Sequence, residues 1–254
     1  MTTTAKTLYI VGAGPGDAEL ISVKGLKLIQ RAEVVLYDAL VSPELVQCVP
    51  DNCKRVYVGK RKGKKEFSQD EINRLLVFYA RRYRCVVRLK GGDPYVYGRG
   101  HEELAYAVSQ GITTEVVPGI SSSIAAPSEA GIPLTKRGVN ESFWVVTGTL
   151  SSGELANDLY WAARSSATVV VLMGRSQVEA IANIFSRERS PDEPAAIIQS
   201  ATTAESRTVI GTASTLHQLA EVNAIGSPAI LVFGKVINER IVADTIAHTQ
   251  AATV

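Results

Sequence analysis

The sequence predicts an α/β protein, and three observations lead to this fold class. Short apolar runs rich in β-branched residues recur along the 254-residue chain, as expected of buried strands. Segments with apolar residues at helical spacing separate most of these runs, which is the element order of a parallel sheet. Glycine-rich loops follow several runs, and open α/β sheets bind ligands at the carboxyl ends of their strands. Breakers and charges in residues 131–138 place a domain boundary there, so we expect two α/β domains, residues 1–134 and 135–254.

The first half reads as five strands and at least three helices. The strands are expected over residues 8–11, 34–37, 56–59, 86–90 and 114–117. Helical patterns cover residues 20–31 and 102–108. A further helix begins at Ser68, because Glu71 stands at the position that completes a capping box.

The second half repeats the alternation of strands and helices. Its strands are expected over residues 143–146, 168–172, 195–198, 208–211 and 229–233. Helices fit residues 178–187 and 216–222. This pattern indicates a second α/β layer.

Composition excludes several classes of protein. A formal net charge of +2 does not favour a nucleic-acid partner. No apolar stretch has the length of a membrane span, and the first residues lack the pattern of a signal peptide, so we expect a cytoplasmic protein with no membrane partner. Three scattered histidines predict no metal site. The three cysteines form no CxxC pair and are expected to be buried free thiols.

The segment 91–100 is the most informative loop. It holds four glycines, Asp93, Arg99 and two tyrosines, directly after an expected strand and before an expected helix. A Gly-Gly pair alone is most simply a tight turn. Here the concentration of special backbone and polar side chains predicts a ligand-binding loop instead.

The loop 12–17, GAGPGD, resembles a dinucleotide-binding fingerprint, with Asp38 as the acid that would bind a ribose. Its glycine spacing is G-x-G-x-G, however, and Pro15 removes a backbone N–H where a pyrophosphate needs a donor. The loop is therefore better suited to close contact with a small ligand than to binding a phosphate group. A nicotinamide-dependent dehydrogenase remains the minority alternative.

Two further stretches have competing interpretations. The basic run 60–65 is a solvated loop, a nucleic-acid contact, or a surface facing a small anionic substrate. The absence of interleaved aromatic residues favours the small anion. The small residues of 120–127 allow a ligand to lie close to a helix start, and tight packing explains them equally well.

Four segments together resemble one known family. They are YIVGAGPGDAELISVKGLKLIQRAEVVLYDALV, VGKR, VVRLKGGDPYVYGRG and VVPGISSSIAAPSEAGIPLTKRG. In this order they are similar to the uroporphyrinogen-III C-methyltransferases of the tetrapyrrole methylase family, over residues 9–236. The resemblance implies S-adenosyl-L-methionine bound in the cleft between two α/β domains of a homodimer. It also implies methylation of uroporphyrinogen III at C2 and C7 to precorrin-2, for siroheme and cobalamin synthesis, with release of S-adenosyl-L-homocysteine.

The resemblance carries residue roles onto this sequence. Asp38 matches the proton acceptor and Lys60 the proton donor. The basic residues near the expected cleft would pair with substrate carboxylates, and they are Arg61, Arg99, Lys136 and Arg137. The positions that match cofactor contacts are Pro15, Gly91, Gly92, Asp93, Val96, Ser121, Ser122, Met173, Ala201 and Ala229.

The sequence departs from the family pattern at three positions. His101 stands where glycine is expected, Thr149 where histidine is expected, and Ser122 where alanine is common. Alternatives also remain. From its sequence context alone, Asp38 reads more simply as a turn residue, the acceptor of the same fold can be a later precorrin, and the chain can be a binding module without catalysis.

Overall fold

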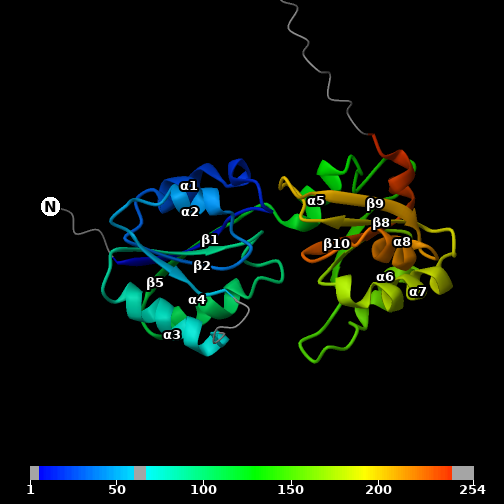
Figure 1. The fold of residues 1–254 in the computed structure, drawn as a ribbon. Coiled ribbons are helices and arrows are strands. Elements are labelled where there is room, and N and C mark those ends of the chain that lie inside the picture. The colour runs from blue at the N-terminus through cyan, green and yellow to red at the C-terminus, as the bar shows by residue number, and fades with distance from the viewer. Residues whose placement is uncertain (1–5, 60–66, 242–254) are drawn as a thin grey trace, which may run out of the picture. The chain divides into compact units, whose positions relative to one another are not determined.

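The computed structural model describes residues 6–59 and 67–241, so the expected proton donor Lys60 and the basic Arg61 lie outside the described residues. The chain forms two compact units (Figure 1). One lies within residues 1–126 and includes residues 199–207, and the other lies within 127–198 and 208–254. The expected α/β class is confirmed. The boundary between residues 134 and 135 stays a prediction.

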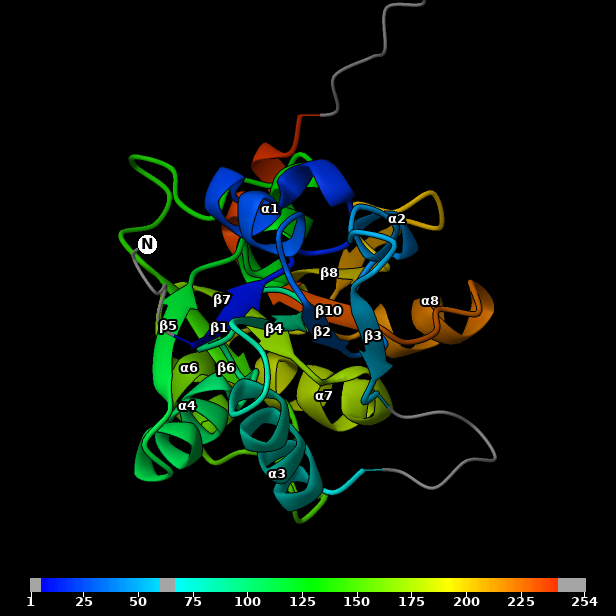
Figure 2. The ribbon, with the colours of Figure 1, turned by 90° about the vertical axis from the view of Figure 1, so that its left-hand side faces the viewer.

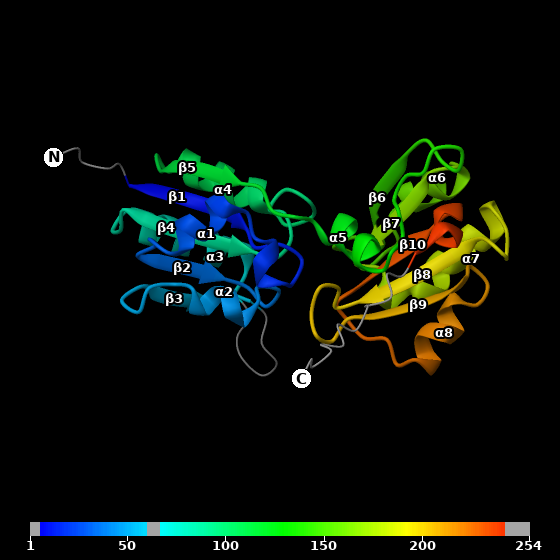
Figure 3. The ribbon, with the colours of Figure 1, turned by 90° about the horizontal axis from the view of Figure 1, so that it is seen from above.

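The first unit contains a parallel sheet whose strand order is β3-β2-β4-β1-β5 (Figure 3). All four neighbouring pairs run parallel, so the carboxyl ends of the strands meet at one edge. The strands are β1 (Thr7–Gly12), β2 (Val34–Tyr37), β3 (Lys54–Tyr57), β4 (Cys85–Lys90) and β5 (Thr113–Val117). β3 begins and ends two residues before the expected strand, and the other four overlap their expected ranges.

Helices cover both faces of this sheet. The pair α1 (Val23–Ile29) and α2 (Pro43–Gln47) lies on one side, and α3 (Gln69–Ala80) and α4 (Gly100–Ser109) lie on the other (Figure 2). Successive side chains of a strand point to opposite faces of the sheet, so each pair of helices has its own core. Val87 packs with the first pair of helices and Val86 with the second.

Capping side chains determine where the helices α1 and α3 begin. The Ser68 hydroxyl and the Glu71 side chain form the reciprocal capping box at the start of α3, as predicted. The helix expected over residues 20–31 is shorter. The Ser22 hydroxyl caps α1 at Gly25, after a separate 3-10 turn, Ala18–Leu20.

The second unit contains a mixed sheet whose strand order is β6-β7-β10-β8-β9. The β6–β7 pair is parallel and the β7–β10 pair is antiparallel. Its strands are β6 (Phe143–Thr147), β7 (Thr168–Leu172), β8 (Pro194–Gln199), β9 (Arg207–Thr212) and β10 (Ala229–Phe233). Its helices are α6 (Asp158–Arg164), α7 (Val178–Glu188) and α8 (Leu216–Val222), and α5 (Ser122–Glu129) spans the boundary between the units. The rings of Phe185 and Phe233 stack at 3.9 Å in its core.

Candidate functional site

Three loops meet at the carboxyl edge of the first sheet, after β1, β4 and β5. The backbone N–H of Gly14 donates to the Gly92 carbonyl at 3.3 Å, and the Gly92 N–H donates to the Gly14 carbonyl at 2.7 Å. A Cβ atom on Gly119 would lie 2.2 Å from the Gly92 carbonyl oxygen, so no larger residue fits there without movement. The glycines thus allow the three loops to touch through their backbones.

Asp93 ties two of these loops together. Its Oδ2 atom accepts a hydrogen bond from the Gly119 N–H at 3.0 Å, and its Oδ1 atom accepts one from the Tyr95 N–H at 2.8 Å. The expected cofactor residues Pro15, Gly91 and Asp93 all lie at this junction. The Asp93 carboxylate contacts the protein's own backbone, so its observed role is to hold the loops in place.

Gly92 borders open space within the same junction. A Cβ atom on Gly92, whose φ is +66°, would meet nothing within 4 Å. The Gly92 backbone is therefore open on the side where a side chain would project, while the neighbouring glycines are closely packed. This arrangement suits close approach of a small ligand to the main chain, and binding of a ligand by this loop stays a prediction.

Two other groups of expected cofactor residues lie beside these loops. Ser121 is buried, and its hydroxyl bonds the Ser123 hydroxyl at 2.8 Å while Ser122 begins α5. The Ala201 carbonyl lies 3.0 Å from the position of a Cβ atom on Gly16, which places it beside the loop of Pro15. The structure therefore brings Ala201 to the first unit, although it is far along the chain.

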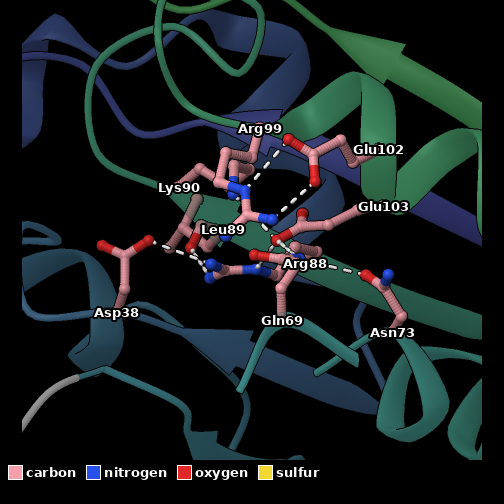
Figure 4. A network of polar contacts seen from close by, with 9 residues as sticks. All are labelled: Asp38, Gln69, Asn73, Arg88, Leu89, Lys90, Arg99, Glu102 and Glu103. Atoms are coloured by element: carbon pink, nitrogen blue, oxygen red, sulfur yellow. Dashed lines mark hydrogen bonds and ion pairs between the residues drawn. The ribbon is translucent and has the colours of Figure 1, made fainter. Parts of the chain in front are cut away.

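A buried polar network lies between β4 and the helices α3 and α4 (Figure 4). Arg88 donates from Nη2 to the Asp38 Oδ2 atom at 3.1 Å and from Nε to the Glu103 Oε1 atom at 3.2 Å. Lys90 donates from Nζ to the same Glu103 oxygen at 2.9 Å, and Gln69 donates to it at 3.4 Å. Because residues two apart in a strand share a face, Arg88 and Lys90 point together to the face that α3 and α4 cover.

This network holds charges away from solvent. The side chain of Glu103 is fully buried, and those of Arg88 and Lys90 are 4% and 6% exposed. Burial lowers the pKa of the Lys90 ammonium, and the Arg88 charge lowers it further, while Glu103 opposes both effects. Among the residues that the structure describes, the Glu103 Oε2 atom has no hydrogen-bond partner. An unpaired carboxylate oxygen is costly to bury.

Asp38 has the turn contact that its sequence context suggested, and its expected role as proton acceptor stays a prediction. It follows β2, and its Oδ1 atom accepts a hydrogen bond from the Leu40 N–H at 3.2 Å, as a turn residue does. Its Oδ2 atom pairs with Arg88, and its side chain is 24% exposed. The carboxylate is therefore fixed on both oxygens and still reaches solvent.

Arg99 also pairs with a carboxylate, but at the surface. Its guanidinium donates to both oxygens of Glu102, at 3.0 and 2.6 Å, which raises the pKa of Arg99 and lowers that of Glu102. Arg99 has a left-handed backbone with φ of 59°, and Tyr97, next to the exposed Val96, has φ of 54°. Strained backbone of this kind gathers at functional loops.

The remaining expected residues belong to the second unit. Met173 follows β7 with φ of 55°, is half exposed, and accepts at its carbonyl a hydrogen bond from the Thr149 hydroxyl at 3.0 Å. Ala229 is the first residue of β10. Lys136 pairs with Glu239, and Arg137 is exposed.

Sequence reasoning missed Arg88, Lys90 and Glu103 as parts of the site. A signal was available: two cations two residues apart in a central strand share one covered face and need buried anionic partners. Glu103 stands on the helix that follows, at the helix start. The expectation of buried thiols holds for Cys53 but is wrong for Cys48, which is exposed because it lies at the end of the short surface helix α2.

Within residues 6–59 and 67–241, no group of three or more His, Cys, Asp or Glu side chains is placed to hold a metal ion. In the same ranges, no helix is both long enough and apolar enough to cross a membrane.

This chain is similar to proteins of one known family. A family model described as Tetrapyrrole (Corrin/Porphyrin) Methylases matches residues 7–217. The chain is 44% identical over 233 residues to the uroporphyrinogen-III C-methyltransferase of Methanocaldococcus jannaschii, covering 91% of this chain and 96% of that protein.

Two further similarities concern a longer protein and a solved structure. The chain is 46% identical to the siroheme synthase of Chromobacterium violaceum over 92% of its own length, and it spans about half, 50%, of that protein. The crystal structure of the Thermus thermophilus uroporphyrin-III C-methyltransferase, complexed with S-adenosyl homocysteine, matches with a TM-score of 0.79 and 40% identity, covering 92% of this chain and 99% of that one.

Proposed function

This chain belongs to the tetrapyrrole (corrin/porphyrin) methylase family, and we propose that it transfers methyl groups from S-adenosyl-L-methionine to uroporphyrinogen III. The observation that carries the proposal is its similarity to the Methanocaldococcus methyltransferase over nearly the full length of both chains. The reaction methylates C2 and C7, gives precorrin-2 and releases S-adenosyl-L-homocysteine. The product serves siroheme and cobalamin synthesis. The further activities of the longer siroheme synthases lie outside this proposal.

The junction of the three loops fits the proposed cofactor. The close packing of Gly12 and Gly119 holds the loops together, and the Gly92 backbone, open on the side where a side chain would project, is accessible to a small polar ligand. Pro15, Gly91 and Ser121 would line it, and Asp93 would hold the loops that bind it. We assign further cofactor contacts to Val96, Ser122, Ala201, Met173 and Ala229 on the family pattern alone.

In this mechanism the chain's own residues align the reactants and move a proton. S-adenosyl-L-methionine supplies an activated methyl group on a sulfonium, which leaves as a neutral thioether. A pyrrole carbon of the substrate takes this methyl group, so most of the rate comes from holding two bound reactants in line. The methylated ring then loses a proton. Asp38 would accept it, because its carboxylate is charged, fixed in position and open to solvent on one side.

We assign proton donation to Lys60 on the family pattern alone. Substrate carboxylates would pair with Arg61, Arg99, Lys136 and Arg137. Two of these already have partners, since Arg99 bonds Glu102 and Lys136 bonds Glu239. Both would have to exchange a protein carboxylate for one of the substrate.

An anaerobic incubation of the purified chain with S-adenosyl-L-methionine and uroporphyrinogen III tests the proposal. After oxidation, the tetrapyrrole mass should rise by two methyl groups. A single addition would mean early release after the first transfer. No addition, with S-adenosyl-L-methionine still bound, would move the acceptor to a later precorrin, and binding of a nicotinamide cofactor in its place would favour a dehydrogenase.

We also propose that the enzyme forms a homodimer in the cytoplasm, and that it binds a tetrapyrrole as its small-molecule partner but no nucleic acid. Light scattering of the purified chain tests the dimer. A mass equal to one chain of 27.2 kDa would contradict it.

A further inference from the structure

Arg88 connects the proposed proton acceptor to a fully buried carboxylate. Its guanidinium makes three contacts: with Asp38 at 3.1 Å, with Glu103 at 3.2 Å, and with the Leu89 carbonyl at 2.9 Å. These contacts use all three guanidinium nitrogens and leave the side chain one orientation (Figure 4).

The stability of the fold does not explain this arrangement. Buried ion networks are often replaceable by apolar residues of similar volume at no loss of stability, because desolvation offsets the attraction between charges. The second sheet illustrates the alternative: every residue of its strand β7, next to its edge strand, is buried and none is charged. The first sheet instead buries Arg88 and Lys90 in a central strand and leaves one Glu103 oxygen without a partner among the described residues.

We propose that Arg88 is a positioning residue, which holds the Asp38 carboxylate in the orientation that accepts the substrate proton, while Glu103 holds Arg88. This inference rests on the proposed function and deepens it. Asp38 is fixed at Oδ1 by the Leu40 N–H and at Oδ2 by Arg88. Loss of Arg88 would remove one of the two contacts and free the carboxylate to rotate.

The charges of the network suit a carboxylate that changes its protonation state. Two cations, Arg88 and Lys90, face two carboxylates, Asp38 and Glu103. In the proton transfer, the C–H bond of the methylated ring breaks, its electron pair restores the unsaturated ring, and an O–H bond forms on Asp38. Arg88 then loses one counter-charge but keeps Glu103, so it is not left as an unpaired buried cation.

A double-mutant cycle tests this inference. Arg88→Gln should lower kcat about 100-fold, the effect expected of a misplaced general base, and change KM for S-adenosyl-L-methionine less than about twofold. Arg88→Lys should restore little, since an ammonium cannot reach both carboxylates in the same geometry. In the Asp38→Asn background, Arg88→Gln should cause no further loss of kcat, because Arg88 acts through Asp38.

A merely structural Arg88 would behave differently. Its substitution would lower kcat by the same factor with and without Asp38, and that result would overturn the inference. Arg189→Gln is the matched control, since Arg189 is a partly buried arginine, with its side chain 10% exposed, that pairs with Glu193, and its effects should multiply with those of Asp38→Asn. If Arg88→Gln does not fold, the same cycle is run with Glu103→Gln, which keeps the side-chain shape and should lower kcat about tenfold through Arg88.

The design separates this inference from the proposed function. A wild-type chain that transfers no methyl group to uroporphyrinogen III refutes the function, and the positioning role falls with it. An active wild type with multiplicative effects at Arg88 and Asp38 refutes only the positioning role.

Discussion

The Oδ2 atom of Asp93 lies 3.0 Å from the backbone nitrogen of Gly119, so one carboxylate joins the loop after β4 to the loop after β5. The same side chain bonds Tyr95 within its own loop. A charged acceptor on a backbone donor is among the stronger hydrogen bonds in proteins. The junction that exposes the Gly92 backbone therefore depends on Asp93 for its shape.

Replacing Asp93 by asparagine should open this junction. If the amide keeps its oxygen towards Tyr95, its NH2 group faces the Gly119 N–H, and two donors repel. We expect a loss of about 1–3 kcal/mol of stability and at least a tenfold weaker affinity for S-adenosyl-L-homocysteine. Calorimetric titration and thermal unfolding measure the two effects. Asp192→Asn, at an exposed loop of the second unit, is the control, and equal affinity in both variants would contradict the prediction.

Alanine substitutions at Gly119 and Gly111 distinguish the stability cost of a steric clash from that of backbone strain. Gly119→Ala places a Cβ atom 2.2 Å from the Gly92 oxygen, so it should destabilise the protein by about 3 kcal/mol or more. Gly111→Ala adds a Cβ atom into open space at φ of +72°, and strain alone should cost about 1–2 kcal/mol. Urea unfolding of both variants gives the comparison. Similar losses would mean that the three loops are not packed as described.

Most of the sheet architecture could be predicted from local sequence signals. β2, β7 and β10 occupy the predicted ranges. The apolar runs of β2 and β10 end at Asp38 and Gly234, and β7 ends before Met173, whose φ of 55° leaves the extended conformation. The capping box of Ser68 fixed the start of α3. The helices α2 and α6 were not expected, since they have only 5 and 7 residues and so carry too little of a helical pattern to recognise.

The candidate site was predictable only in part, for a physical reason. Pro15, Gly91, Gly92 and Asp93 stand in loops whose composition is unusual in itself. Arg88 looks like an ordinary residue of an apolar strand, and its role appears only when strand alternation and a helix beyond the loop bring Glu103 beside it. Such long-range pairing leaves little trace in a single sequence.

Arg99 should contribute to substrate affinity rather than to folding. Its guanidinium is 55% exposed and paired with Glu102 in a geometry that also suits a substrate carboxylate. Arg99→Ala should raise KM for uroporphyrinogen III about tenfold and leave thermal stability nearly unchanged, because exposed pairs stabilise little. Steady-state kinetics at low and high salt measure the effect. A large fall in unfolding temperature with unchanged KM would assign Arg99 to the fold instead.

The three thiols should react at different rates. Cys48 is exposed, whereas burial raises the pKa of both Cys53 and Cys85 and shields them from reagents. A thiol-specific reagent near neutral pH should therefore modify Cys48 first, and mass spectrometry of peptides identifies the site. Cys48→Ala should abolish the fast phase. A fast phase that persists in this variant would show that a second thiol is accessible.

Cys53 should also make stability depend on pH in the alkaline range. Burial raises the pKa of its thiol from 9.0 to about 11 in the folded protein. Between these values the folded chain keeps a proton that the unfolded chain releases, so the free energy of unfolding falls as pH rises. The thiol's contribution is fully present below pH 9.0 and is lost as pH approaches about 11, with a total on the order of 2 kcal/mol.

Denaturant unfolding of wild type and Cys53→Ala across this range isolates the effect. The absolute stabilities will differ, because the substitution also changes packing, so the slopes with pH are compared. The variant should lose less stability than wild type above pH 9.0. Cys48→Ala should keep the wild-type slope, since Cys48 is exposed. Parallel curves for wild type and Cys53→Ala would mean that the Cys53 thiol ionises equally readily in the folded and unfolded chains.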